Sequence, residues 1–199
     1  MKKEKKMLDV IFILDKSGSM SGSEESTISS FNEYLEKEKK HTFQTNITTI
    51  LFSDQYQYLH HRSPIQQVHK LTKKDYSVGG CTALYDALGN GISFMEQEHA
   101  QKVLFIIITD GYENASSEYS KSRIKNLIKK HDNWEFIYIG ADIDSYSAGH
   151  EIGIRENNIA NYKKDAKGTS KMFQAVCQYE CAMMDNRIDE AAWKSELEA

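Results

Sequence analysis

Apolar residues in this chain gather in short continuous runs that are separated by amphipathic segments. The runs are residues 8–14, 47–53, 102–109 and 134–139, with a last short one at 157–161. Runs of this length that are rich in Ile, Val, Leu and Phe predict β-strands buried on both faces. Residues 56–60 are more polar and follow a turn at Asp54–Gln55, which predicts a short antiparallel strand at the edge of the sheet.

Between the runs, apolar residues recur at helical spacing. The predicted helices cover residues 23–40, 120–131, 142–150 and 169–184, and one more opens at the loop 79–82. Residues 61–76 show no regular pattern and are expected to be irregular. Strands that alternate with helices predict an α/β fold, with a mostly parallel sheet, one antiparallel edge strand and helices on both faces.

The pattern divides the chain into three parts. Residues 1–6 form a basic N-terminal extension, residues 7–184 form one domain, and residues 185–199 form a charged tail that is expected to be helical. The extension and the apolar run after it resemble a signal peptide only superficially. Asp9 interrupts the run and no small-residue cleavage site follows it, so a buried strand is the better interpretation.

Composition narrows the class of protein. Hydrophobic residues make up 40% and charged residues 27% of the 199 residues, as in ordinary globular domains. The net charge of −4 argues against a nucleic-acid-binding protein. No run reaches the roughly 18 apolar residues that would cross a membrane. Cys81, Cys177 and Cys181 are too few for a disulfide framework, so we expect reduced thiols and a cytoplasmic location.

Polar loops follow two of the buried strands. Asp15 opens the segment Asp15–Met20 and Asp110 opens the segment Asp110–Asn114, and both segments contain glycine. A third loop, Gly79–Asp86, opens a helix. Because parallel strands end at the same edge of a sheet, we expect the three loops to lie together, where open α/β sheets bind their ligands.

The loops carry five oxygen donors that suit one cation. They are Asp15, Ser17, Ser19, Thr82 and Asp110. Carboxylates and hydroxyls are hard ligands, which suit Mg²⁺, Mn²⁺ or Ca²⁺ and suit zinc or copper poorly. Two carboxylates roughly neutralise a divalent ion and the hydroxyls add no charge. If some of the carboxylate contacts run through water, the ion stays electrophilic and would accept an acidic oxygen from outside.

Asp15-x-Ser17-x-Ser19, Thr82 in a Gly-Gly-x-Thr loop and Asp110 in a Thr-Asp-Gly turn together resemble the von Willebrand factor type A (vWA) domain, over about residues 7–182. The matching set in that family is the metal-ion-dependent adhesion site (MIDAS). The segment from Phe136 to Tyr162 is similar to stand-alone bacterial or phage members.

The resemblance implies a Rossmann-like fold with the metal at the top of the sheet, held directly by the two serines. It further implies that an Asp or Glu of a partner protein takes the open position on the metal, Mg²⁺ being the preferred ion. Stand-alone members often serve multiprotein complexes, including those of AAA-type ATPases. The chain is therefore expected to be a metal-dependent protein-interaction module without catalytic activity. Neither nucleic acid nor a membrane is expected as a partner.

Several alternatives use the same residues. Taken singly, the five residues could be ordinary turn and cap residues, or the site could be vestigial. The main alternative is a metal-dependent phosphohydrolase, for which Glu113 and Asp86 are the only nearby candidates for a general acid or base. Tyr112, Glu113 and Asn114 are expected either to contact a partner or to shape the turn after Asp110.

Overall fold

The computed structural model describes residues 7–187 and 192–198. Six strands form one mixed sheet in the order β3-β2-β1-β4-β5-β6. They are β1 (Met7–Asp15), β2 (Gln44–Phe52), β3 (Tyr56–Pro64), β4 (Val103–Thr109), β5 (Glu135–Gly140) and β6 (Ile159–Asn161). All neighbours are parallel except β2 and β3, so the predicted α/β fold with one antiparallel edge strand is confirmed.

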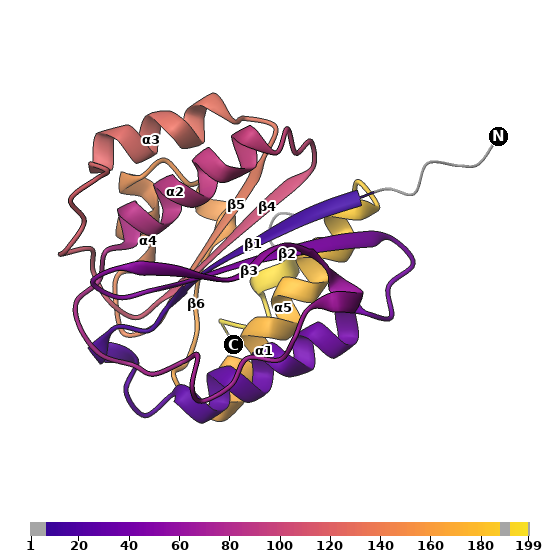
Figure 1. Ribbon diagram of the computed structural model, residues 1–199, viewed down its shortest axis with the longest axis horizontal. Helices are drawn as coiled ribbons and strands as arrows, with labels where there is room; N and C mark the ends of the chain where they lie inside the picture. Colours follow the sequence, from indigo (N-terminus) through magenta and orange to yellow (C-terminus); the bar gives the residue numbers. More distant parts are fainter. Residues whose placement is uncertain (1–6, 188–191, 199) are drawn as a thin grey trace.

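The strand order reverses between β1 and β4, which are parallel neighbours with Leu14 opposite Ile108. From β1 the chain first builds outward to β2 and β3, then crosses back to β4 and builds outward on the other side (Figure 1). This is the strand order of a Rossmann-like doubly wound sheet, a fold in which ligands bind beyond the carboxyl ends of the strands where the order reverses. Asp15 and Asp110 lie at that point.

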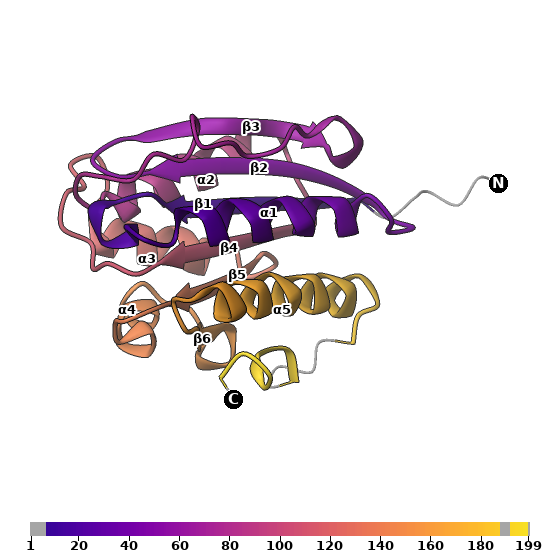
Figure 2. The same ribbon diagram turned by 90° about the horizontal axis from the view of Figure 1, so that it is seen from below.

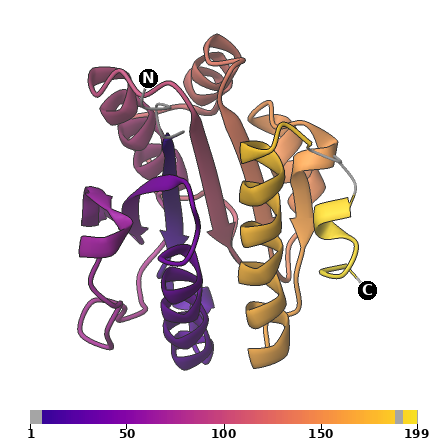
Figure 3. The ribbon, with the colours of Figure 1, turned by 90° about the vertical axis from the view of Figure 1, so that its right-hand side faces the viewer.

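Helices cover both faces of the sheet, as Figures 2 and 3 show. The helices are α1 (Glu24–Glu38), α2 (Leu84–Gln97), α3 (Lys121–Lys130), α4 (Ser145–Glu151) and α5 (Ala166–Met184). The pair α1 and α5 packs on one face, and α2, α3 and α4 pack on the other. Each face therefore has its own apolar core, which explains why β4 is apolar from Val103 to Ile108 with no alternation of polar residues.

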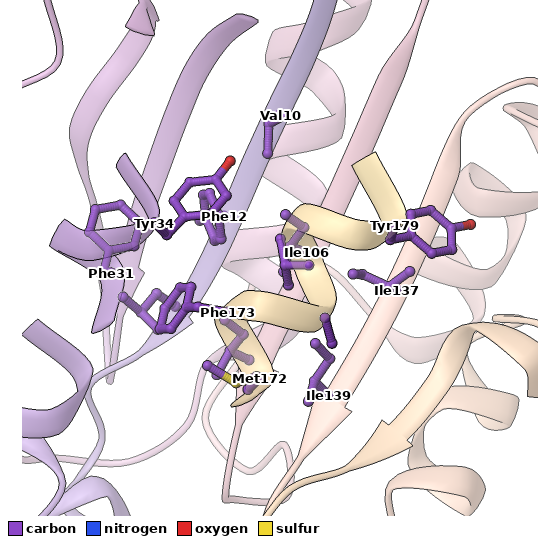
Figure 4. Close-up of a cluster of buried hydrophobic side chains, with 14 of the residues drawn as sticks. Val10, Phe12, Phe31, Tyr34, Ile106, Ile137, Ile139, Met172, Phe173 and Tyr179 are labelled. Carbon is purple, nitrogen blue, oxygen red and sulfur yellow. The ribbon is translucent and has the colours of Figure 1, made fainter. Parts of the chain in front are cut away.

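A group of aromatic side chains lies within the core between the sheet and the α1–α5 pair (Figure 4). Phe12 of β1 meets Phe31 and Tyr34 of α1 edge-on, with ring centroids 5.2 Å and 5.0 Å away. Phe173 of α5 joins the cluster, its ring centroid 5.8 Å from that of Phe31. Edge-to-face contacts of this kind add to the apolar burial and fix the two helices against β1.

Two acidic side chains are buried between the same helices. Glu38 at the end of α1 is 1% exposed, and Glu180 of α5 is fully buried. Tyr34 donates a hydrogen bond of 2.9 Å to Oε1 of Glu180. Among the described residues, no hydrogen bond of good geometry reaches either oxygen of Glu38 or Oε2 of Glu180, although His41 Nε2 lies 3.1 Å from Glu38 Oε1. Burial raises the pKa of both carboxyl groups, and the charge of Glu38 raises that of Glu180 further.

Two expectations need correction. Strand β3 continues to Pro64 and a 3₁₀ turn follows at Ile65–Gln67, so residues 61–67 are not irregular. Proline is tolerated there because β3 is an edge strand. In the tail, the described residues contain one short 3₁₀ turn, Ala192–Lys194, and no α-helix. The basic extension at residues 1–6 lies outside the described residues.

The end of the chain packs against the domain. Trp193 and Leu197 are 4% and 5% exposed and belong to the core on the α1–α5 face. The indole of Trp193 donates a hydrogen bond of 2.9 Å to the carbonyl of Asn157. A search of the described residues finds no helix with the length and apolar character needed to cross a membrane.

Candidate metal centre

The first part of the candidate site is the loop that leaves β1. The Asp15 carboxylate turns back on its own loop and accepts a hydrogen bond of 2.6 Å from the amide of Ser17. A 3₁₀ turn at Gly18–Met20 then brings the hydroxyl oxygens of Ser17 and Ser19 within 3.0 Å of each other. Asp15 and Ser17 are buried, whereas Ser19 is exposed, so the group of oxygens opens toward solvent.

The second part is the end of β4. Asp110 accepts a hydrogen bond on Oδ1 from the hydroxyl of Ser19, and its Oδ2 lies 2.7 Å from Nζ of Lys164. The preceding residue, Thr109, donates a hydrogen bond of 2.6 Å to Oδ2 of Asp15. The two aspartates are therefore held side by side by hydroxyls of neighbouring loops, with every carboxylate oxygen in a polar contact.

The third part is the loop before α2. It is tied to the first loop by two backbone hydrogen bonds, from Gly18 to Gly80 and from Gly79 to Lys16, of 3.0 Å and 2.9 Å. Gly80 has a φ of +83°, and a side chain there would collide with the carboxylate of Asp54. This position therefore needs glycine, because the backbone is left-handed and the space is filled.

Thr82 faces the other ligand candidates from this loop. Asn114 holds it from both sides, because its side chain accepts a 2.9 Å hydrogen bond from the amide of Thr82 and its own amide donates one of 3.0 Å to the carbonyl. A Cβ on Gly111 would lie 2.9 Å from Oγ1 of Thr82 and 3.3 Å from Oγ of Ser19. The two hydroxyls thus converge on one small space that a side chain at position 111 would fill.

The structure brings all five predicted side chains, Asp15, Ser17, Ser19, Thr82 and Asp110, into one cluster. Burial raises the pKa of Asp15, and the nearby charge of Asp110 adds a smaller increase, against the hydrogen bonds from Thr109 and Ser17 that lower it. Two close carboxylates whose charge is costly to keep favour a cation beside them. Hydroxyl and carboxylate oxygens around a glycine cradle therefore fit a hard divalent ion.

The described residues contain no group of three or more His, Cys, Asp or Glu side chains that could hold a metal. A zinc site of the His and Cys type is thus lacking within residues 7–187 and 192–198. Three of the five residues in the cluster described above are Ser or Thr, and for that reason it is a different kind of site.

The residues after Asp110 mainly shape the loops. Glu113 accepts hydrogen bonds on both carboxylate oxygens, among them 2.9 Å from the amide of Tyr85 and 2.7 Å from that of Ser116. Asp86 likewise accepts bonds from three backbone amides of residues 117–119. Both carboxylates therefore fix the loops that surround the cluster. Tyr112 is different, because its side chain is 56% exposed at the rim.

Sequence patterns did not reveal three residues that contact the cluster. Thr109 belongs to the Thr-Asp-Gly turn, but the sequence assigns it no contact with Asp15; Tyr76 lies in the segment expected to be irregular, and Lys164 lies in no motif. The Tyr76 hydroxyl donates a hydrogen bond to the carbonyl of Asp15. Thr109 could have been noticed, since a hydroxyl beside a strand-end aspartate is well placed to bond a neighbouring strand. No sequence signal marks Lys164, because it follows the edge strand β6 and comes close to the cluster only in the folded sheet.

Comparison with known families decides the identity of the fold. Residues 1–131 match the model of the VWA domain containing CoxE-like proteins, which is more than half of the chain. The chain belongs to this vWA family. No curated protein matches the sequence. The resemblance seen in the sequence is thereby confirmed.

Solved structures of vWA proteins are similar in fold. Proximal thread matrix protein 1 from the mussel byssus, with a zinc-occupied MIDAS motif, has a TM-score of 0.66 at 20% identity, over 89% of this chain and 46% of that one. The PilB minor pilin from Streptococcus sanguinis gives 0.65 at 12% identity, over 93% and 63%. The ArnB paralog VWA2 from Sulfolobus acidocaldarius gives 0.59 at 18% identity, over 88% and 45%. The chain thus spans less than two thirds of each of these proteins.

Proposed function

We propose that this vWA domain is a metal-dependent protein-interaction module. In this proposal Asp15, Ser17, Ser19, Thr82 and Asp110 hold one divalent cation, with Mg²⁺ preferred and Mn²⁺ or Ca²⁺ able to replace it. The observation that carries the proposal is the convergence of two buried carboxylates and three hydroxyls, from three separate loops, at the carboxyl edge of the sheet.

A carboxylate of a partner protein would complete the site. Ser19 and the rim residue Tyr112 are exposed, so an Asp or Glu side chain from outside can approach the cluster from solvent. The bound cation supplies the charge that attracts this oxygen. The zinc in the MIDAS motif of the mussel protein supports the proposal that the corresponding place in this chain binds a metal.

We propose a non-enzymatic role rather than metal-dependent phosphohydrolysis. The two candidate acid–base groups, Glu113 and Asp86, are engaged with backbone amides and thus hold loops. The three free thiols are consistent with the proposed cytoplasmic location. A multiprotein complex, for example one with an AAA-type ATPase, remains part of the proposal, and we expect neither nucleic acid nor membrane as a partner.

The experiment that tests the metal site is a thermal melt of chelator-treated protein, titrated with Mg²⁺, Mn²⁺ and Ca²⁺. An ion that binds only the folded state stabilises it by about 2.7 kcal/mol at 100 times its dissociation constant. We expect this gain in the wild type and its complete loss in Asp15→Ala. Asp132→Ala is the matched control, because it removes an exposed carboxylate just after α3, away from the cluster.

A pull-down with and without the effective ion would then identify the partner. If no ion raises the melting temperature of the wild type, the proposed metal site is wrong. If the ion stabilises the wild type and Asp15→Ala equally, it binds elsewhere, and the assignment of the five residues fails. Steady turnover of a phosphate ester that is lost in Asp110→Ala would favour the phosphohydrolase instead.

A further inference from the structure

A lysine from a distant part of the chain reaches into the candidate metal centre. Lys164 lies between β6 and α5, and its ammonium group is 2.7 Å from Oδ2 of Asp110. The same group donates a hydrogen bond to the carbonyl of Ser19. Its side chain is 19% exposed, whereas that of Asp110 is 1% exposed. The ion pair is therefore partly shielded from water, unlike an ordinary surface pair.

The loop that carries Lys164 is fixed by its own hydrogen bonds. Asp165 caps α5 by accepting a 2.7 Å bond from the amide of Gly168. A Cβ on Gly168 would collide with the carbonyl of Lys163, so the glycine allows the loop to fold tightly onto the helix. On the other side, the amide of Tyr162 donates a 2.9 Å bond to the carbonyl of Gly140. The position of Lys164 is thus determined by its surroundings.

Formal charges show what this lysine changes. Asp15, Asp110 and Lys164 together carry one negative charge. With a divalent ion the sum becomes one positive charge, whereas the two aspartates alone would only neutralise that ion. The ammonium also competes with the ion for Asp110 and repels it across a short, poorly screened distance.

We propose that Lys164 is a resident counter-cation of the metal centre that shares Asp110 with the divalent ion. It pairs with Asp110 and with the carbonyl of Ser19 before metal arrives, weakens metal binding, and leaves the loaded site positively charged for an acidic partner. This inference rests on the proposed metal-binding function. Lys164 is thus a residue that sets affinity, and it is not itself a metal ligand.

The test is calorimetric titration of the chelator-treated full chain with Mn²⁺ and with Mg²⁺. Lys164→Met removes the ammonium, and we expect metal binding to become on the order of tenfold tighter because a competing cation is gone. The metal-free form of this variant should melt at a lower temperature than the wild type, since Asp110 loses its partner. Lys164→Arg keeps the charge and should retain an affinity within about twofold of the wild type.

Lys163→Met is the matched control, because it removes an exposed positive charge from the same loop. Its affinity for metal should stay close to that of the wild type, so that the difference between the two variants isolates the contact with Asp110. Equal or weaker metal binding by Lys164→Met, with the wild type binding normally, overturns the inference and leaves the proposed function standing. A wild type that binds neither ion overturns both.

Discussion

Two pairs of carboxyl groups are buried in this protein, one at the carboxyl ends of β1 and β4 and the other between α1 and α5, and their surroundings differ. Asp15 and Asp110 at the ends of β1 and β4 have a polar contact at each of their four oxygens. Glu38 and Glu180 between α1 and α5 have a well-formed hydrogen bond at only one, from Tyr34. Both pairs are almost completely buried.

The two pairs differ in the donors around them. Hydroxyls, an amide and an ammonium contact the aspartates, and the hydrogen bonds from Thr109 and Ser17 lower the pKa of Asp15 against the larger increase from burial. The glutamates have fewer such donors, with a well-formed hydrogen bond only from Tyr34, and burial raises the pKa of both. Their side of the molecule therefore favours carboxylic acids that keep a proton, with His41, Cys177 and Cys181 as the other titratable groups nearby. Two buried carboxyl groups close together are therefore not sufficient to indicate a metal site.

The largest effect should come from removing a charge at the aspartate pair. We expect Asp110→Asn to lose the whole stabilisation by metal, about 2.7 kcal/mol at 100 times the dissociation constant, because one of the two charges that balance the ion is gone. Glu180→Gln should keep the full metal response. Melting curves with Mg²⁺ and with chelator check both variants. If the two variants respond equally to metal, the prediction that only the aspartate pair binds the ion is wrong.

The next effect concerns pH. Since the folded pKa values of Glu38 and Glu180 are raised, the native state holds more protons than the unfolded state above the ordinary Glu pKa of about 4.3. The stability that the protonated pair contributes is therefore fully present below that pH. It is lost as pH rises through the raised pKa values of the two carboxyl groups. Glu180→Gln is expected to stabilise the protein by about 1–3 kcal/mol at pH 8 and to do little at pH 4.5.

Urea denaturation of metal-free wild type and Glu180→Gln across this pH range measures the effect. Glutamine keeps the oxygen that accepts from Tyr34, so the comparison changes the charge with little change of shape. A wild-type stability that rises steadily with pH, or a variant that is less stable at pH 8, would show that the glutamates are ionised in the native state.

A smaller effect is expected at Thr109, whose hydroxyl donates to Asp15. Thr109→Val removes this donor while conserving volume, and should lower the metal-free stability by about 1–2 kcal/mol and weaken metal binding. Thr109→Ser keeps the hydroxyl and serves as the control. Denaturation and metal titration of both variants check the prediction, which fails if valine and serine behave alike.

The sequence was sufficient to predict the fold and the five candidate ligands. Asp15 and Asp110 follow strongly apolar runs, and glycine-containing loops after such strands meet at one edge of a parallel sheet. The extent of β3 could not be predicted, because residues 61–64 have no apolar alternation and are held by pairing with β2. Local pattern says little about an edge strand that depends on its neighbour.

Contacts between distant segments were beyond the sequence pattern. The elements α3, β5, α4 and β6 separate Asp110 from Lys164 along the chain. Only the folded sheet therefore brings the ammonium group of Lys164 to the site. Glu180 sits at a position that helical spacing assigns to α5 without saying that a second acid, Glu38, faces it. The burial of Trp193 in a charged tail likewise depends on tertiary packing.

The loop before α2 also offers a practical handle. Its Cys81 is exposed, whereas Cys177 and Cys181 are half-buried in α5. A hydrogen bond to Asp54 raises the pKa of the Cys81 thiol, so alkylation there needs a mildly alkaline buffer. A fluorophore attached at this position would sit one residue before Thr82. Its emission would report when the loop is occupied, without any knowledge of the partner.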